Sequence, residues 1–396
     1  MTLVPVAEVQ AAIVNGVEHL DAETVSIFKA AGRILAENLR AKLTQPPFTA
    51  SAMDGYAVRA ADIASIPACL KVIGRSAAGH GFNGEVGADE AVRIFTGAPV
   101  PAGADTIVIQ ENTKAAGEGV VEILEPSSLG QYVRPQGYDF SEGEILLAAG
   151  IELQSRQLML AAAMNHATVP VRRKPIVAVL ANGDELVQPG QLPAADQIIS
   201  SIPAGMKAAI AAWGGASLLL DLARDSKESL SACVRNAQKA DVLLTIGGAS
   251  VGEHDLVHGT LEDMGARFEV LRVAMRPGKP VMFGFLGNQR ILSMPGNPAS
   301  AVICARVFLK PLLDRFLGRA RSDELRTVRL AVPVEVNGER EHYMRAQLSG
   351  DGVAPIGDQD SSLMNAFAKA DCLLVRPARG PALPAGSLVP VIPLDF

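Results

Sequence analysis

One stretch of the chain decides the fold: Val242-Leu243-Leu244-Thr245-Ile246-Gly247-Gly248-Ala249-Ser250-Val251-Gly252-Glu253. A short apolar run that ends in glycine is typical of a buried strand followed by a turn. Gly248 and Gly252 let successive backbone N–H groups point at one anion, and Ser250 adds a hydroxyl that can donate to phosphate. Because short glycine motifs occur often by chance, a plain turn that packs strand against helix is the alternative.

The segments around this stretch alternate between strand and helix patterns. Strands are expected at residues 176–180, 217–220, 242–246 and 291–294, and helices at 204–213, 226–240 and 299–317. Strands that alternate with helices imply right-handed crossovers and a mostly parallel, doubly wound sheet. The sequence therefore predicts an α/β domain over residues 171–320.

The flanking segments have a different character. Helical spacing of apolar residues over 5–40 and 145–171 predicts a discontinuous helical linker domain, residues 1–45 and 140–170. Short β-like runs between Gly, Pro and Asn predict an inserted β-rich domain over 46–139. Similar runs broken by proline predict a small β-barrel-like domain over 321–396. The length of 396 residues is compatible with this division, since one core rarely serves so long a chain.

Composition excludes several classes of protein. Hydrophobic residues make up 48% of the chain and charged residues 20%, which excludes an intrinsically disordered chain. Charged residues, Gly or Pro interrupt every apolar stretch before the roughly 18 residues that a membrane helix needs. A net charge of −6 with 4% aromatic residues excludes a nucleic-acid partner. No targeting segment is visible, so the expected compartment is the cytoplasm, with no membrane partner.

Three acidic residues follow expected strands of the α/β domain. Asp184, Asp225 and Asp255 stand where the carboxyl ends of parallel strands form ligand sites. Two carboxylates at about 4 Å repel by some 4 kcal/mol at a dielectric constant near 20, so their convergence needs a cation. Mg²⁺ is the natural partner because it takes oxygen ligands. The alternative is that each Asp caps a turn or helix, above all Asp225 before Ser226.

Two proline-rich loops supply further polar groups. Arg276-Pro277-Gly278-Lys279-Pro280 places two cations beside a stiff turn, which suits a fixed anion. Pro295-Gly296-Asn297-Pro298 allows close approach of a ligand to the backbone, with an amide that donates and accepts. The alternatives are solvated surface charges for the first loop and helix initiation for the second.

Two more motifs complete a pattern. Ser51-Ala52-Met53-Asp54-Gly55-Tyr56-Ala57-Val58-Arg59 and Thr96-Gly97-Ala98-Pro99-Val100-Pro101, followed by the three loops described above, resemble the MoeA family of molybdopterin molybdenumtransferases, which includes the C-terminal part of gephyrin. The resemblance covers essentially the whole chain. It implies an elongated four-domain homodimer, in which the linker domain serves dimerisation and the α/β domain resembles the molybdopterin adenylyltransferases.

The resemblance also implies an activity. Family members take adenylylated molybdopterin, release AMP in a step that depends on a divalent metal, and insert molybdate to form molybdenum cofactor. The cofactor is thus Mg²⁺, held by Asp184, Asp225 and Asp255, and the substrates are molybdate and adenylylated molybdopterin. A molybdopterin adenylyltransferase and apo-molybdoenzymes are the implied transient partners.

Site residues carry over by motif, with the site shared between subunits. The catalytic positions are Asp54, Asp139, Asp184, Asp225, Asp255 and Lys279, and the binding positions are Thr96, Arg134, Gly248, Ser250, Gly252, Glu253, Arg276, Pro295, Gly296, Asn297, Pro298, Arg345 and Ser361. Asp54, Thr96, Arg134 and Asp139, with Arg345 and Ser361, would come from the second subunit. The general base is not assigned.

The sequence departs from the family pattern at two positions. Arg276 stands where the family commonly has Lys, and Ile202 stands where a polar residue is usual. A guanidinium does not replace a compact ammonium freely at an oxyanion site. Two alternatives therefore stay open: a pterin-binding scaffold or carrier with altered chemistry, and a molybdopterin adenylyltransferase.

Overall fold

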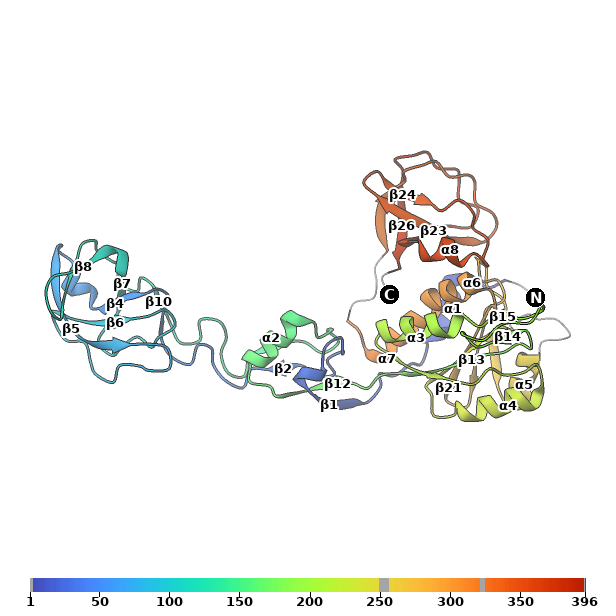
Figure 1. Ribbon diagram of the computed structural model, residues 1–396, viewed down its shortest axis with the longest axis horizontal. Helices are drawn as coiled ribbons and strands as arrows, with labels where there is room; N and C mark the ends of the chain where they lie inside the picture. The colour runs from blue at the N-terminus through green and yellow to red at the C-terminus, as the bar shows by residue number, and fades with distance from the viewer. Residues whose placement is uncertain (1–2, 249–255, 321–324, 395) are drawn as a thin grey trace.

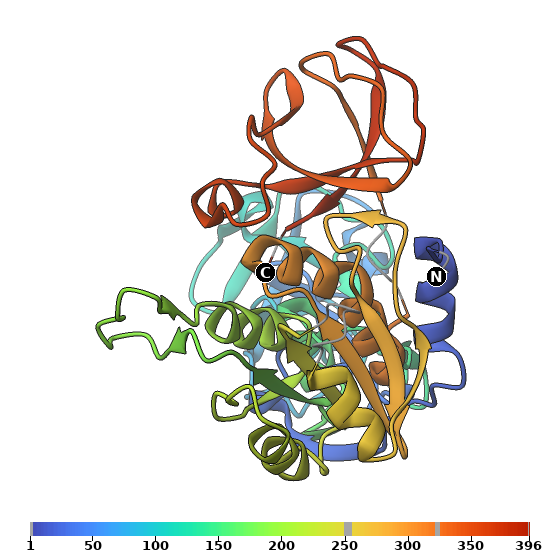
Figure 2. The ribbon, with the colours of Figure 1, turned by 90° about the vertical axis from the view of Figure 1, so that its right-hand side faces the viewer.

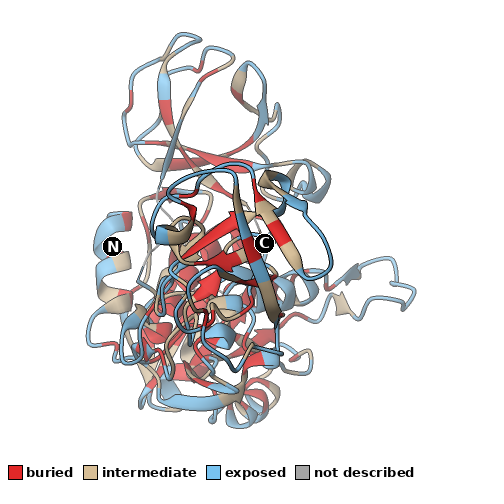
Figure 3. Ribbon diagram, turned by 90° about the vertical axis from the view of Figure 1, so that its left-hand side faces the viewer, coloured by how far each residue is buried: buried red, intermediate tan, exposed pale blue. Residues whose placement is uncertain are grey.

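The structure is a computed structural model that describes residues 3–248, 256–320, 325–394 and 396. The chain is extended, as Figure 1 shows: a β-rich body of residues 46–139 lies at one end, and a small middle body follows. The α/β body and the C-terminal β body lie together at the other end. Figure 3 shows that buried residues concentrate in the strands of these bodies, whereas the connecting loops are exposed.

The α/β body contains a six-stranded sheet in the order β16-β13-β17-β21-β20-β18. The strands are β13 (Ile176–Ala181), β16 (Ala216–Leu219), β17 (Val242–Ile246), β18 (Arg267–Val270), β20 (Met282–Leu286) and β21 (Gln289–Met294). Four of them, β16, β13, β17 and β21, are parallel, as predicted. β20 and β18 add an antiparallel edge that was not predicted. The α/β fold class is confirmed.

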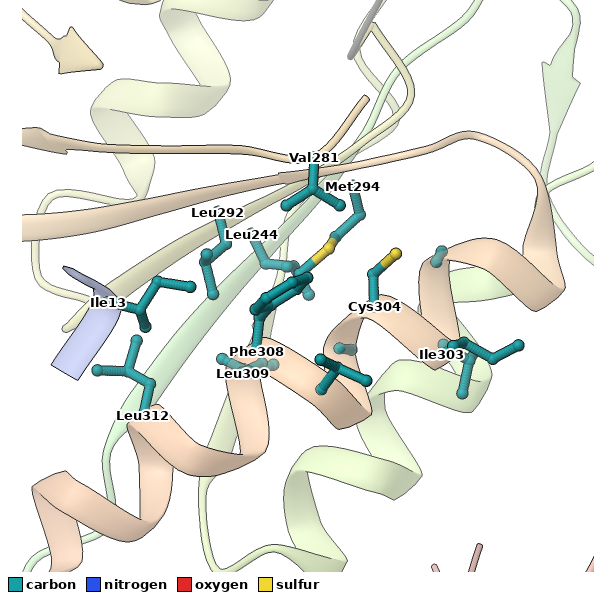
Figure 4. Close-up of a cluster of buried hydrophobic side chains, with 14 of the residues drawn as sticks. Ile13, Leu244, Val281, Leu292, Met294, Ile303, Cys304, Phe308, Leu309 and Leu312 are labelled. Carbon is teal, nitrogen blue, oxygen red and sulfur yellow. The ribbon is translucent and has the colours of Figure 1, made fainter. Parts of the chain in front are cut away.

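Helices cover both faces of this sheet. One face packs on α1 (Val6–Val14), α3 (Ile202–Ala212), α6 (Pro298–Cys304), a π-helical turn (Ala305–Leu309) and α7 (Lys310–Leu317). The other face packs on α4 (Lys227–Asn236) and α5 (Leu256–Asp263). Neighbouring residues of β17 alternate between the two cores, Leu244 toward the first and Leu243 toward the second. Figure 4 shows Leu244 and Leu292 facing Phe308 in the first core.

The helix expected over residues 5–40 is confined to α1. It ends at Val14, and Gly16 then adopts φ +62°, a left-handed conformation that stops a helix. Ile13 packs against the α/β sheet and not within the middle body, as Figure 4 shows. This part of residues 1–45 thus contributes to the α/β core, contrary to the prediction.

The middle body is formed mostly by strands where helices were expected. Two antiparallel pairs hold it together: β1 (Ala22–Ser26) with β12 (Thr168–Arg172), and β2 (Leu39–Arg40) with β11 (Ile145–Leu147). Its helices are α2 (Ser155–Ala163) and the short turn η1 (Ile27–Lys29). β-branched residues such as Val25 and Val169, which are partners in register, favour the pleated conformation over the helix.

The other two bodies are built from short strands. In the β-rich body the sheet order is β7-β4-β6-β5-β9-β8, with the two-stranded pair β3 (Ala50–Ser51) and β10 (Val133–Arg134) beside it. The six strands are β4 (Gly55–Val58), β5 (Ala68–Ser76), β6 (Glu90–Ile94), β7 (Thr106–Ile109), β8 (Thr113–Ala115) and β9 (Val120–Ile123). Two short turns, η2 (Ala60–Ile63) and η3 (Gln110–Asn112), connect them.

The C-terminal body contains a third mixed sheet, in the order β19-β23-β25-β26-β22, with β24 paired to β23. Its strands are β19 (Met275–Arg276), β22 (Arg326–Arg329), β23 (Glu341–Ser349), β24 (Gly352–Pro355), β25 (Cys372–Arg376) and β26 (Leu388–Pro393). β19 comes from the α/β body, so this sheet joins the two bodies, and the helix α8 (Met364–Ala368) lies beside α6. Among the described residues, no helix has the length and apolar character needed to cross a membrane.

Candidate functional site

A cavity of about 560 Å³ lies at the carboxyl ends of the parallel strands. It lies at the end of β13, the strand at which the order of the sheet reverses: the chain continues to β16 on one side of β13 and then to β17 on the other. Its lining comprises Asn182, Gly183, Glu185, Ile198, Asp225, Gly247, Gly248, Leu256, Val257, Pro280, Pro295, Gly296 and Asn297. The structure therefore brings together Asp225, Gly248, Pro295, Gly296 and Asn297 from the predicted set.

Asp225 of the cavity lining forms hydrogen bonds with Asp184, which lies just outside the lining, and with Asn182. The backbone N–H of Asp225 donates to Asp184 Oδ1 at 3.3 Å, and the side chain of Asn182 donates to Asp225 Oδ1 at 3.1 Å. Asn182 is buried, and its Oδ1 has no hydrogen-bond partner among the described residues. An orphaned amide oxygen beside carboxylates is an acceptor-rich group of the kind that a hard cation takes as ligands.

The glycine turn after β17 has a specific conformational need. Gly247 has φ +92° and Gly248 φ +60°, both in the left-handed region that favours glycine. A Cβ on Gly248 would lie 2.3 Å from Cγ2 of Val257 on α5. The N–H of Gly247 donates to the carbonyl of Met294 at 3.1 Å, which ties the turn to the end of β21. Glycine at 248 thus lets the turn and α5 close one wall of the cavity.

The C-terminal body reaches the rim of this cavity through Ser361. Asn297 donates its side-chain amide to Ser361 Oγ at 2.9 Å, and the N–H of Ala299 donates to the carbonyl of Ser361 at 3.2 Å. Asn297 and Ser361 are therefore in direct contact within one chain, whereas Ser361 was expected to come from the second subunit. Pro298 begins α6 as its first residue, the helix-initiation role weighed as an alternative for this loop.

Arg345 occupies a different environment from the one expected of a substrate-binding cation. It is only 1% exposed, and its guanidinium donates to the carbonyls of Leu363, Asp358 and Asp360 at 2.9–3.1 Å. These three bonds hold the loop that carries Ser361. In this chain Arg345 is placed to position Ser361 rather than to contact a ligand itself.

The two cations of the Arg276–Pro280 loop point to different places. Pro280 lines the cavity described above, and Lys279 beside it is exposed. Arg276 instead lies in β19, whose pairing with β23 carries it to a separate cavity in the C-terminal body. The structure therefore does not bring Arg276 into the lining of the first cavity.

Four predicted residues lie in the β-rich body, at the far end of the chain in Figure 1. Asp54 Oδ1 accepts hydrogen bonds from the N–H and from the hydroxyl of Thr96, each at 2.7 Å. These two bonds, together with the nearby Arg93, lower the pKa of Asp54. Arg134 and Asp139 are both exposed. Within one chain, these residues are remote from the cavity at the sheet.

Ser250, Gly252, Glu253 and Asp255 fall outside the described residues, so the structure does not place them. Two members of the predicted metal trio, Asp184 and Asp225, are described and adjacent. Within residues 3–248, 256–320 and 325–394, no group of three or more His, Cys, Asp or Glu side chains is arranged to hold a metal ion.

Two polar residues of the cavity lining were not among the predicted site residues. Asn182 and Glu185 belong to the turn after β13, in which only Asp184 was assigned a role. The available signal was the polar quartet Asn182-Gly183-Asp184-Glu185 directly after an apolar run, because that position is where open α/β sheets bind ligands.

A polar, glycine-bordered cavity at the carboxyl ends of parallel strands is typical of α/β proteins that bind a ligand at this edge of the sheet. Residues 4–165 match the MoeA N-terminal region (domain I and II), residues 178–315 a probable molybdopterin binding domain, and residues 327–394 the MoeA C-terminal region (domain IV). The chain belongs to the MoeA family of molybdopterin molybdenumtransferases and is a transferase.

Relatives extend over nearly the full chain. A molybdopterin molybdenumtransferase of Haemophilus influenzae is 32% identical over 94% of each chain. One of a Nostoc species is 32% identical over 95% of this chain and 89% of its own. A solved molybdopterin biosynthesis MoeA protein of Pyrococcus horikoshii superposes with a TM-score of 0.87 at 32% identity, and the match covers 100% of both chains.

Proposed function

We propose that this protein inserts molybdate into adenylylated molybdopterin with hydrolytic release of AMP, and so forms molybdenum cofactor. The observation that carries the proposal is the cavity of about 560 Å³ at the sheet, which combines the Gly247–Gly248 turn with Asp225 and Asn297. Relatives named molybdopterin molybdenumtransferase support the choice of substrate.

The glycine turn would hold the phosphate groups of the adenylylated substrate. The N–H of Gly247 already donates to Met294, so the donors would be the N–H of Gly248 and, by motif, those of the residues after it. Such backbone groups bind anions without a net positive charge on the protein. This suits a chain whose net charge is −6. Ser250, Gly252 and Glu253 of the same loop are assigned to this role by motif alone.

Mg²⁺ fits the oxygen ligands offered by Asn182 and Asp225 of the cavity lining and by Asp184 beside them. Asp184 and Asp225 offer carboxylate oxygens, and the Asn182 Oδ1 that lacks a partner among the described residues offers an amide oxygen beside them. By motif, Asp255 would complete the set. A bound Mg²⁺ supplies positive charge that stabilises the phosphate oxygens during cleavage of the P–O bond.

Molybdate would be organised by Lys279 and by the Asn297–Ser361 pair. Lys279 follows the stiff Pro277–Gly278 turn and is exposed next to the cavity wall at Pro280. Asn297 of the lining and Ser361 beside it contribute an amide and a hydroxyl. Donors fixed before the substrate arrives stabilise the charge of a reacting oxyanion at little reorganisation cost.

A second copy of the chain would complete the site. Asp54, Thr96, Arg134 and Asp139 lie in the β-rich body, which one chain holds far from its own cavity in Figure 1. An elongated protein can place these residues against the cavity of a partner in a two-fold dimer. We therefore propose a homodimer with two shared sites, which acts in the cytoplasm between a molybdopterin adenylyltransferase and the apo-molybdoenzymes.

The decisive experiment measures AMP and active cofactor. Purified protein is incubated with adenylylated molybdopterin, Mg²⁺ and molybdate under reducing conditions, and the product is added to an apo-molybdoenzyme. Release of AMP with recovery of enzyme activity supports the proposal, and absence of both contradicts it. Asp225→Asn should abolish turnover, whereas Asp221→Asn, the same change at an exposed aspartate outside the cavity lining, should not.

The same assay separates the alternatives. A scaffold or carrier would bind the pterin tightly without release of AMP. An adenylyltransferase would consume ATP when it is given free molybdopterin. Either result, in place of AMP release from the adenylylated substrate, would overturn the proposed activity.

A further inference from the structure

A second cavity, of about 590 Å³, opens at one end of the C-terminal body. It shares no lining residue with the cavity at the parallel strands. Its walls come from β23, β25 and the segments 334–338 and 357–359, and Arg276 of β19 closes one side. The proposed function makes no use of this cavity.

Three basic side chains form a row along its wall. Arg276 of β19 is the register partner of His342 of β23, and His342 is the register partner of Arg376 of β25. Adjacent strands are about 4.8 Å apart, so partners on three neighbouring strands lie side by side on one face. All three residues line the cavity.

Arg376 is buried with a donor that is not used. It is 2% exposed, and although Nη2 donates to the carbonyl of Pro381, Nε has no hydrogen-bond partner among the described residues. Burial lowers the pKa of this guanidinium. Over the described part of the chain, neither Arg276 nor Arg376 forms an ion pair with a carboxylate. A buried cation without a counter-charge is costly unless an anion pairs with it.

His342 reports the same electrostatic environment. It is 7% exposed, and its pKa is lowered to about 4. Burial is the largest cause, and the positive charges of Arg276, Arg340, Arg376 and Arg345 lower the pKa further. Nearby cations oppose its protonation. Two arginines and a neutral imidazole thus line the cavity, and the two carboxylates of the lining, Glu335 and Asp358, form no ion pair with them in the described part of the chain.

The other polar groups of the lining are committed elsewhere. The side-chain amide of Asn337 donates to three backbone carbonyls, and Gln359 bonds to the backbone of Arg345 through both its oxygen and its nitrogen. Glu335 and Asp358 are exposed at the rim, and Asp358 Oδ1 accepts from the N–H of Asp360. The donors left for a ligand are those of the three basic residues.

We propose that this cavity is a second anion site, which binds an oxyanion of the phosphate class through Arg276, His342 and Arg376. Guanidinium groups suit such an ion because they present several N–H donors in a fixed plane to tetrahedral oxygens. The volume exceeds that of a single oxyanion, and Val334 and Met344 contribute apolar surface. The ligand is therefore either free phosphate or the phosphate end of an organic monoester.

The test uses the full-length protein with inorganic phosphate alone, in the absence of pterin and molybdate. Titration calorimetry measures the affinity, and histidine NMR signals, of which the chain has 6, report where the ion binds. Comparison with His342→Gln assigns the signal of His342. We expect phosphate to shift this signal and to raise the pKa of His342, since a bound anion favours the charged imidazole.

Two substitutions test the donors, and a third is their control. Arg376→Met and Arg276→Met should each weaken phosphate binding at this site at least tenfold. Arg379→Met removes the same charge at a side chain that is 80% exposed in the same body and outside the cavity lining, so it should leave the affinity unchanged. Arg276 is exposed in β19, so its substitution keeps the test valid if Arg376→Met fails to fold.

The outcomes are distinct. An unshifted His342 signal at saturating phosphate overturns the proposal, and so does an equal loss of affinity in Arg379→Met. Tighter binding of glycerol phosphate than of inorganic phosphate identifies an organic monoester as the ligand, and the reverse order identifies the free ion. Because the experiment contains no pterin, its result is independent of the AMP-release assay.

Discussion

Asn297 and Ser361, which are 64 positions apart in the sequence, share a hydrogen bond of 2.9 Å between the side-chain amide and the hydroxyl. The bond joins the loop after β21 to the C-terminal body at the rim of the proposed active site. Arg345 fixes the loop that carries Ser361, because its guanidinium donates to the carbonyls of Asp360 and Leu363 on either side of that residue. The orientation of Asn297 therefore depends on a body whose described residues do not themselves line that cavity.

Ser361→Ala removes the partner of the Asn297 amide. A neutral hydrogen bond contributes about 1 kcal/mol, so we expect KM for molybdate to rise roughly fivefold while the fold is retained. The matched control is Ser362→Ala, which breaks a bond to Asp360 instead. AMP-release kinetics at varied molybdate measure the difference, and equal KM values in the two variants would contradict the positioning role.

Gly248→Ala tests the tight turn after β17. The new Cβ would lie 2.3 Å from Val257 Cγ2 in a backbone with φ +60°. Left-handed strain and overpacking together should lower the free energy of unfolding by about 2 kcal/mol or more. Gly259→Ala, on the open side of α5 with no atom within 4 Å of its Cβ, should instead stabilise the protein by about 1 kcal/mol. Urea unfolding of both variants gives the comparison.

The hydrogen bonds from Thr96 to Asp54 predict that a substitution of Thr96 will change the pKa of Asp54. Two hydrogen bonds from Thr96 lower the pKa of Asp54 from 3.8, so the contact stabilises the fold above that pH and is lost as the pH falls through the lowered value. Thr96→Val removes the hydroxyl donor and should raise the Asp54 pKa toward 3.8. NMR titration of the Asp54 carboxyl detects this shift. Thr113→Val, whose hydroxyl donates to a carbonyl of the same body, should leave that pKa unchanged.

His342 should make the free energy of unfolding depend on pH between about 4 and 6.5. Its pKa is 6.5 when unfolded and about 4 in the cavity, because burial and the surrounding arginines oppose its charged form. Between these values the unfolded chain binds more protons, so the free energy of unfolding should rise as the pH increases from 4 to 6.5. His342→Gln should flatten this part of the profile in urea unfolding at fixed ionic strength, and an unchanged slope would argue against a buried neutral imidazole.

The parallel strands could be predicted because both faces of such a sheet are buried. Residues 242–246 and 176–180 then appear as nearly continuous apolar runs with clear ends. β18 lies at the edge and lacks that contrast, and it was missed together with its neighbour β20, whose apolar run is interrupted by Gly284. The helix expected beyond Val14 failed for another reason: the spacing of apolar residues resembled a helix, but β-branched residues at Thr24 and Val25 form a strand with a partner more than 140 positions away.

The site was predictable where a residue's role depends on its own loop, and not where it depends on a distant contact. Gly248, Asp225 and Asn297 follow strand ends, and the strand pattern alone brings them together. Arg345 instead donates hydrogen bonds to backbone carbonyls of residues 358–363, and these bonds depend on how that loop folds over its side chain. Arg276 reaches the second cavity because β19 pairs with β23, a contact between two bodies that no local pattern encodes.

A shared site predicts complementation between two inactive variants. Asp54→Ala damages the contribution of the β-rich body, and Asp225→Asn damages the cavity at the sheet. In a mixed dimer, one site carries both substitutions and the other carries neither. Random exchange makes about half of the dimers mixed, so AMP release should recover to about one quarter of the wild-type rate after the two variants are unfolded and refolded together.

The control mixture is Asp225→Asn with Asp225→Ala, which leaves every site damaged and should show no recovery. If the Asp54 and Asp225 mixture also stays inactive while gel filtration shows mixed dimers, the two residues act within one chain. That result would require the β-rich body to swing onto its own sheet, since Figure 1 places it at the opposite end of the chain. Recovery would instead make the extended shape itself a functional requirement, because only a chain that keeps the two bodies apart can donate one to a partner.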